Sequence, residues 1–201
     1  MTGFIHRFVP ATVPGRPPLL LLHGTGGDEN DLLPLGEAVA PGAALLSPRG
    51  QVLENGMPRF FRRLAEGVFD AEDLRRRTDD LAAFVRATRE EHGLAAPVAL
   101  GYSNGANIAA SLLLRHPGLL RGAILLRAMV PFRPPVAPRL DGTAVLLLSG
   151  AADPVVPAAN SGELAALLEQ AGASVTHHNL PVGHGLSQAD LTLGGKWLRA
   201  L

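Results

Sequence analysis

The chain has 201 residues, of which 47% are hydrophobic and 18% are charged, and it contains no cysteine. This length is ample for one hydrophobic core, and we expect a single domain spanning residues 1–201. Lys and Arg together number 18, as do Asp and Glu, so no overall positive charge attracts nucleic acid or an anionic membrane. The lack of cysteine excludes disulfides, thiolate catalysis and cysteine-ligated metals.

The beginning of the chain, MTGFIHRFVP, lacks the basic stretch, apolar run and small-residue cleavage site of a secretory signal. Its apolar runs, such as Leu19–Leu22, are too short to span a bilayer. We therefore expect a cytoplasmic protein with no membrane span and no nucleic-acid partner. A homodimer is compatible with the sequence.

Short apolar runs alternate with longer segments of helical period, which is typical of a mostly parallel sheet covered by helices. The predicted strands are Phe4–Val9, Leu19–Leu22, Ala43–Ser47, Val98–Leu100, Ala123–Leu126, Ala144–Leu148 and Ser174–Leu180. The predicted helices are Glu29–Val39, Ala71–Glu91, Gly105–Arg115, Ala158–Gln170 and Leu186–Leu201. The segment Gln51–Asp70 is predicted to be irregular and Pro131–Pro138 to be a connection, and neither is long enough to form a lid domain.

The motif Gly101-Tyr102-Ser103-Asn104-Gly105 lies between a predicted strand and a predicted helix. This is the G-x-S-x-G pattern in the strand–turn–helix context that it requires, where the glycines allow a tight turn that exposes the serine. A serine hydroxyl needs an adjacent base to act as a nucleophile. A glycine-flanked serine in an ordinary turn is the alternative, so a base must be found.

Among the seven histidines, His184 is placed best to be that base. It lies in Val182-Gly183-His184-Gly185, between the last predicted strand and the last predicted helix. His177 and His178 are adjacent within a strand and point to opposite faces, whereas His23 follows a strand beside Gly24 and is expected to hold the geometry of that loop.

A serine and a histidine that act together usually need an acidic residue that orients the histidine. In a catalytic triad built on a G-x-S-x-G turn, this acidic residue lies between the serine and the histidine in the chain, here between Ser103 and His184. Asp153 follows the predicted strand Ala144–Leu148, and its carboxylate could fix the His184 tautomer and stabilise the imidazolium. An ordinary Asp-Pro turn is the alternative. Asp141 precedes the strand and so belongs to the opposite edge of the sheet, and Asp190 lies inside the last helix.

The glycine-rich stretch His23-Gly24-Thr25-Gly26-Gly27-Asp28 follows a buried strand. No Gly-Lys-Ser/Thr follows it, so a phosphate-binding P-loop is not supported. An oxyanion hole fits better, with one backbone N–H from Thr25 and one from Asn104, the residue after the serine.

These motifs in this order resemble the α/β-hydrolase superfamily, and within it the small cap-less carboxylesterase/phospholipase family. The resemblance runs from Leu19 to the last helix and is carried by HGTGGDENDLLPL, GYSNGANIAA, SGAADPVVP and VGHGLS. It implies a three-layer α/β fold with a mostly parallel central sheet, helices on both faces and no cap domain. It also implies Ser103, Asp153 and His184 as the triad and Thr25 and Asn104 as the oxyanion hole. A metal-dependent hydrolase is a weaker alternative, because the sequence has no His-x-x-x-His or His-Glu-x-x-His run, so we expect no metal or cofactor.

The predicted activity is that of a carboxylesterase-type serine hydrolase that forms an acyl-enzyme on short-chain, soluble small-molecule esters. Lysophospholipids and acyl thioesters are alternative substrates, and a non-catalytic binding protein on the same fold is a further alternative. Phe60, Phe61 and Met129 could line the substrate pocket. Arg62, Arg63 and Arg127 could meet an acidic substrate or form structural ion pairs, and the sequence leaves both readings open.

Overall fold

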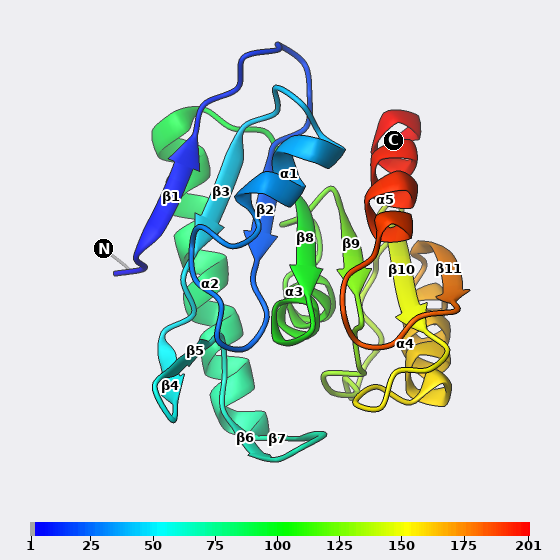
Figure 1. Cartoon of the computed structure of the whole chain (residues 1–201). Coiled ribbons are helices and arrows are strands. Elements are labelled where there is room, and N and C mark those ends of the chain that lie inside the picture. Colours follow the sequence, from blue (N-terminus) through cyan, green and yellow to red (C-terminus); the bar gives the residue numbers. More distant parts are fainter. Residues whose placement is uncertain (1–2) are drawn as a thin grey trace.

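The computed structural model describes residues 3–201, and seven strands form its main sheet in the order β1-β3-β2-β8-β9-β10-β11 (Figure 1). They are β1 (His6–Val9), β2 (Leu19–Leu22), β3 (Leu45–Pro48), β8 (Val98–Tyr102), β9 (Gly122–Leu126), β10 (Ala144–Gly150) and β11 (Ser174–Leu180). Within this sheet β1 pairs antiparallel with β3, and every other pairing is parallel. The carboxyl ends of six strands therefore open onto one edge.

Helices cover both faces of the sheet, which confirms the predicted three-layer α/β fold. The helices are α1 (Leu33–Val39), α2 (Ala71–His92), α3 (Asn104–Arg115), α4 (Ala158–Gln170) and α5 (Gln188–Ala200). Strand β2 shows why the layers form. All four of its leucines are fully buried; Leu20 and Leu22 pack in the core that contains α2, α3 and α4, whereas Leu19 and Leu21 pack on the side of α1 and α5. An unbroken apolar run is what a strand covered on both faces requires.

The segment Gln51–Asp70 forms two small hairpins, so the prediction of an irregular stretch is wrong. Strand β4 (Val52–Glu54) pairs with β5 (Met57–Arg59), and β6 (Arg63–Ala65) pairs with β7 (Val68–Phe69). Asn55 and Gly56 join β4 to β5 with φ angles of 52° and 80°. The Asn-Gly pair suits a two-residue hairpin turn because both residues tolerate positive φ.

Helix α1 begins at Leu33 rather than at Glu29. The backbone N–H of Asn30 donates to the Asp28 carboxylate at 2.7 Å, which forms a local turn in place of the first helical turn. Pro34 then occupies the beginning of the helix, where its missing N–H costs nothing. The first strand and the last helix also begin slightly later than predicted, at His6 and Gln188.

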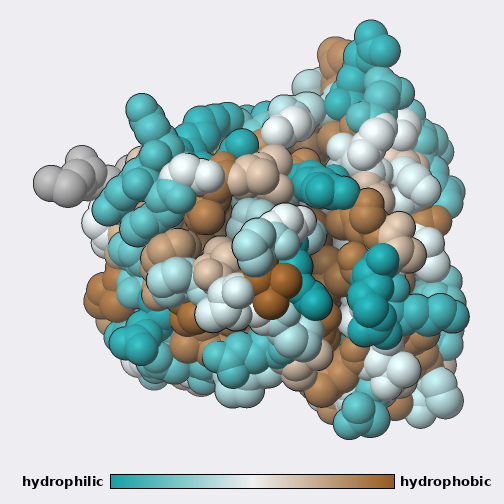
Figure 2. Space-filling model, turned by 90° about the horizontal axis from the view of Figure 1, so that it is seen from above, coloured by the Kyte–Doolittle hydropathy of each residue, from teal (hydrophilic) through white to brown (hydrophobic). Residues whose placement is uncertain are grey.

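The amino ends of the parallel strands form the opposite edge, which holds a hollow of about 610 Å³. Figure 2 is seen from this side, and hydrophilic and hydrophobic residues are interspersed over it. The hollow is lined by loop residues such as Pro18, Gly93 and Asp141, with no serine or histidine among its lining residues.

Among the helices of residues 3–201, none combines the length and apolarity needed to cross a membrane. The same residues include no cap domain over the carboxyl edge.

Candidate active site

Ser103 occupies a sharp turn between β8 and α3, with φ 53° and ψ −113°. The flanking glycines are needed because the backbones approach too closely for a side chain. A Cβ atom on Gly105 would lie 2.0 Å from the Leu22 carbonyl oxygen, and one on Gly101 would lie 2.6 Å from the Gly105 carbonyl oxygen. The turn lifts the Ser103 side chain out of the sheet at its carboxyl edge. A backbone in this sparsely populated region is a feature that clusters at functional sites.

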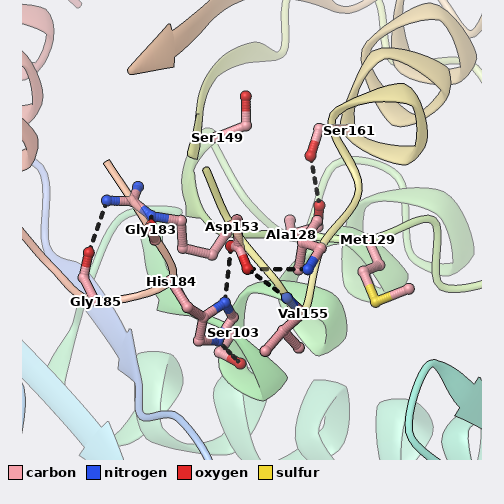
Figure 3. A network of polar contacts seen from close by, with 12 residues as sticks. Ser103, Ala128, Met129, Ser149, Asp153, Val155, Ser161, Gly183, His184 and Gly185 are labelled. Carbon is pink, nitrogen blue, oxygen red and sulfur yellow. Dashed lines mark hydrogen bonds and ion pairs between the residues drawn. The ribbon is translucent and has the colours of Figure 1, made fainter. Parts of the chain in front are cut away.

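The loops after β8, β10 and β11 bring Ser103, Asp153 and His184 into one chain of hydrogen bonds (Figure 3). His184 Nε2 lies 2.9 Å from Ser103 Oγ, and His184 Nδ1 lies 2.8 Å from Asp153 Oδ2. With Nδ1 donating to the carboxylate, Nε2 is left free to accept the serine proton. The three residues are 81 and 31 positions apart in sequence along the two hydrogen bonds, so the fold alone brings them together.

Asp153 has a fully buried side chain that is nevertheless held in its charged form. Burial disfavours the charge, but the N–H of Val156, the His184 imidazole and the N–H of Val155 outweigh it, so the pKa of the carboxyl lies below its ordinary value. Both backbone donors reach Oδ1, at 3.0 Å from Val156 and 2.8 Å from Val155. This leaves Oδ2 for His184, and it fixes the carboxylate in the orientation that the imidazole needs.

Thr25 and Asn104 flank Ser103 in a small pocket at this edge. Asn104 is the first residue of α3, where backbone N–H groups have no acceptor within the helix. Thr25 lies in the loop after β2, and no loop hydrogen bond within residues 3–201 uses its N–H. Both groups are thus available to a developing oxyanion. The Arg59 guanidinium donates to Thr25 Oγ1 at 2.7 Å and ties this loop to the first hairpin.

The pocket has a volume of about 40 Å³. It is lined by Thr25, Arg59, Arg63, Glu66, Gly67, Phe69, Ser103, Asn104, Asn107, Met129, Val155 and Val156. Met129, one of the predicted substrate-binding residues, is in this lining. Phe60 and Phe61, the other two, are 2% and 0% exposed and pack in the core beneath it. Residues 3–201 hold no group of three or more His, Asp or Glu side chains placed for a metal ion.

Known proteins resemble this chain in sequence and in fold. A family model described as "Serine aminopeptidase, S33" matches residues 65–144. The chain is 48% identical over 183 residues to the Bacillus subtilis (strain 168) protein described as "Putative hydrolase MhqD", which covers 90% of this chain and 92% of that protein. The chain belongs to the α/β-hydrolase superfamily.

Solved structures show the same fold. The crystal structure of a Bacillus cereus carboxylesterase superposes with a TM-score of 0.95 at 48% identity, over 98% of this chain and 94% of that one. A carboxylesterase from Mesorhizobium loti gives 0.93 at 36% identity, over 98% and 95%.

In this α/β-hydrolase a buried arginine holds the loop that carries His184. Arg127 follows β9 and is fully buried. Its guanidinium donates to the carbonyl oxygens of Gly183 at 3.1 Å and Gly185 at 3.0 Å, on either side of His184. It also pairs with the Asp190 carboxylate, with both N–O distances below 3 Å. Of the two readings that the sequence left open for Arg127, the structural ion pair is the one observed.

Replacing Arg127 with methionine should lower the free energy of unfolding of this hydrolase by about 3–5 kcal/mol, because it leaves the Asp190 carboxylate buried without its cation. Urea denaturation followed by circular dichroism measures the change. The double variant Arg127→Met/Asp190→Asn removes the stranded charge and should recover part of the loss. A double variant less stable than Arg127→Met would contradict this explanation.

His23, predicted to hold loop geometry, binds backbone groups on both sides of its ring. Nδ1 lies 2.7 Å from the Gly24 carbonyl oxygen, and Nε2 accepts the N–H of Gly50 at 2.9 Å. Only a neutral imidazole can donate at Nδ1 and accept at Nε2. Burial, opposed by the Gly24 carbonyl and by nearby carboxylates, lowers the pKa of His23 below its ordinary value. Its role is thus to connect the glycine-rich loop to the segment after β3.

This lowered pKa predicts a loss of stability in acid. Below about pH 6.5 the unfolded chain binds a proton at His23 that the folded chain excludes, so each further pH unit costs up to about 1.4 kcal/mol until the folded-state pKa is reached. Urea unfolding at about pH 7.5 and about pH 5 should therefore show a smaller pH-dependent difference for His23→Asn than for the wild type. An identical difference in both proteins would rule out His23 as the cause.

A second serine–histidine pair lies apart from the first. Ser149 Oγ is 2.8 Å from His177 Nε2, but this histidine sits in the middle of β11, and no carboxylate is hydrogen-bonded to it within the described residues.

Two residues that contact the site were not predicted from the sequence. Tyr102 OH donates to the His184 carbonyl oxygen at 3.2 Å, and Arg59 lines the pocket. Arg59 lies in the segment predicted to be irregular, where no periodicity marked it.

Proposed function

We propose that this α/β-hydrolase is a serine carboxylic-ester hydrolase that works through an acyl-enzyme. The observation that carries the proposal is the chain from Ser103 Oγ through His184 to Asp153, with distances of 2.9 Å and 2.8 Å. Nucleophile and base lie within hydrogen-bond reach, and a third group orients the base. A non-catalytic binding protein would have no need of this alignment at the mouth of a pocket.

In the first half of the reaction, Ser103 Oγ attacks the ester carbonyl carbon while His184 Nε2 takes the hydroxyl proton. The carbonyl oxygen gains negative charge, which the N–H groups of Thr25 and Asn104 stabilise. Cleavage of the ester C–O bond releases the alcohol, which receives the proton from His184. In the second half, water attacks the acyl-enzyme with His184 again as base, and the carboxylic acid leaves as Ser103 regains its proton.

Asp153 stabilises the transient imidazolium, and its buried carboxylate is held in the charged form by the two backbone donors described above. The size of the pocket, about 40 Å³, supports short acyl groups over long lipid chains. The mechanism requires no metal or cofactor.

A hydrolysis screen tests the proposal. Methyl or 4-nitrophenyl esters with two to twelve acyl carbons should be cleaved fastest at the short end, and matched thioesters and lysophospholipids more slowly. Maximal activity on a lysophospholipid or an acyl-coenzyme thioester would assign a different substrate class. A chain that cleaves none of these compounds, yet is folded, would refute the proposed activity.

A further inference from the structure

Two guanidinium groups form one wall of the pocket beside Ser103. Arg59, from β5, is 3% exposed, and Arg63, at the beginning of β6, has a side chain that is 31% exposed. Both line the same pocket as Ser103. Arg62, between them in sequence, instead pairs with Asp70 at 2.9 Å and is not part of the lining. Of the three arginines in residues 59–63, Arg59 and Arg63 therefore line the pocket and Arg62 does not.

The two arginines share a single carboxylate. Glu54 Oε2 lies 3.1 Å from Arg59 Nε, and Glu54 Oε1 lies 2.9 Å from Arg63 Nη2. Glu66 also lines the pocket, but it is exposed, and no ion pair within residues 3–201 joins it to either arginine. A buried charge is stable only when it is paired. Among the described residues, Glu54 is thus the one carboxylate that is ion-paired with these two guanidinium groups, and Arg59 is the buried one of the two.

The guanidinium of Arg59 has N–H groups that are not used in hydrogen bonds among the described residues. Its Nε donates to the Phe61 carbonyl oxygen at 3.2 Å and its Nη1 to Thr25 Oγ1 at 2.7 Å, whereas no hydrogen bond within the described chain uses Nη2. Burial lowers the pKa of Arg59 from its ordinary value, with Glu54 raising it and Arg63 lowering it further, yet a guanidinium remains protonated in proteins. Because the group only donates, a ligand at this wall must present acceptor atoms. A carboxylate offers two acceptor oxygens to a guanidinium and adds a second negative charge beside two cations that share Glu54.

We infer that this wall is a carboxylate subsite and that the preferred substrates are short esters whose acyl group carries a free carboxylate, that is, half-esters of small dicarboxylic acids. The inference rests on the proposed ester hydrolysis. The acyl side is favoured because the acyl group stays on Ser103 after the alcohol has left, and a pocket of about 40 Å³ suits a short, retained group. Phe69, Met129 and Val155 in the same lining offer apolar contacts to its methylene groups.

The test compares monomethyl succinate with methyl 4-methylpentanoate, in which an isopropyl group replaces the carboxylate at nearly equal size. Proton release at constant pH measures kcat/KM for each. The wild type should favour the succinate ester by about tenfold to a hundredfold, as charge-assisted hydrogen bonds imply. Arg59→Met should lose most of this preference, Arg63→Met should lose part of it, and Arg59→Lys should retain some. Arg62→Met is the matched control and should keep the wild-type preference.

Equal rates on both esters in the wild type, or an unchanged preference in Arg59→Met, would overturn the subsite while leaving ester hydrolysis intact. Failure to cleave either ester would refute the proposed activity instead, so the two failures are distinguishable. Should Arg59→Met not fold, the wild-type preference and its reduction in Arg63→Met decide the matter, since Arg63 is on an outer hairpin and is only partly buried.

Discussion

Replacing Ser103 with alanine should lower kcat/KM for short esters by about ten-thousand-fold or more, because no other group can form the acyl-enzyme. The fold should persist, since alanine keeps the Cβ atom of the turn and removes only a hydroxyl that bonds to His184. Spectrophotometric hydrolysis of 4-nitrophenyl acetate measures the loss, and circular dichroism checks the fold. Mass spectrometry after treatment with an organophosphate should find the label on Ser103 in the wild type and no label in the variant.

Ser149 offers a matched control because it, too, bonds to a histidine, at 2.8 Å, but lies apart from the Ser103–His184–Asp153 chain (Figure 3). Ser149→Ala should keep activity within about tenfold of the wild type, as expected for a serine outside a catalytic unit. Labelling that survives in Ser103→Ala, or that disappears in Ser149→Ala, would move the nucleophile away from the turn after β8.

Replacing Asp153 with asparagine should cost about ten-thousand-fold in kcat, as a wrong histidine tautomer does in serine proteases. The side-chain oxygen can still accept the N–H groups of Val155 and Val156, so the loop should keep its shape. The new amide, however, can present its own N–H to His184 Nδ1. Nε2 would then carry the proton, and it could no longer accept one from Ser103.

His184→Ala should be at least as damaging, and Asp153→Asn/His184→Ala should be little worse than either single variant, because residues that act as a unit are not additive. Rates on one short ester, with folding checked separately, complete this cycle. His177→Ala should stay within about tenfold of the wild type. Independent, multiplicative losses at Asp153 and His184 would show that the two residues do not act together.

The sequence predicts the parts of this fold that depend on local pattern. Leu19–Leu22 reads as a doubly covered strand, and the glycines around Ser103 mark a turn whose tightness the structure explains through Leu22 and Gly105. Motif order then suggested Asp153 and His184 as partners, and the strands end where that suggestion requires. The motifs and the strand topology therefore both place Ser103, Asp153 and His184 at the carboxyl edge of the sheet.

Other features depend on contacts that sequence spacing cannot reveal. Arg127 meets Asp190 across 63 residues, and nothing near either residue indicates the pair. Phe60 and Phe61 were expected at the pocket, but their ring positions depend on how two short hairpins fold back over the core. The Asn55-Gly56 pair was a usable hairpin signal that the surrounding glycine and proline content obscured.

Arg127 donates hydrogen bonds to both neighbours of His184, Gly183 and Gly185. This has a consequence for which substitutions can change the substrate preference of the protein. Arg127, which follows β9, binds Gly183 in the histidine loop, Leu148 in β10 and Asp190 in α5. The pocket wall, in contrast, comes from hairpins that the main sheet does not include. Substitutions in those hairpins can therefore reshape substrate preference while His184 stays in place. Directed evolution that randomises residues 51–70 should yield altered specificity at little loss of turnover, and the same diversity at residues 182–190 should mostly yield inactive protein.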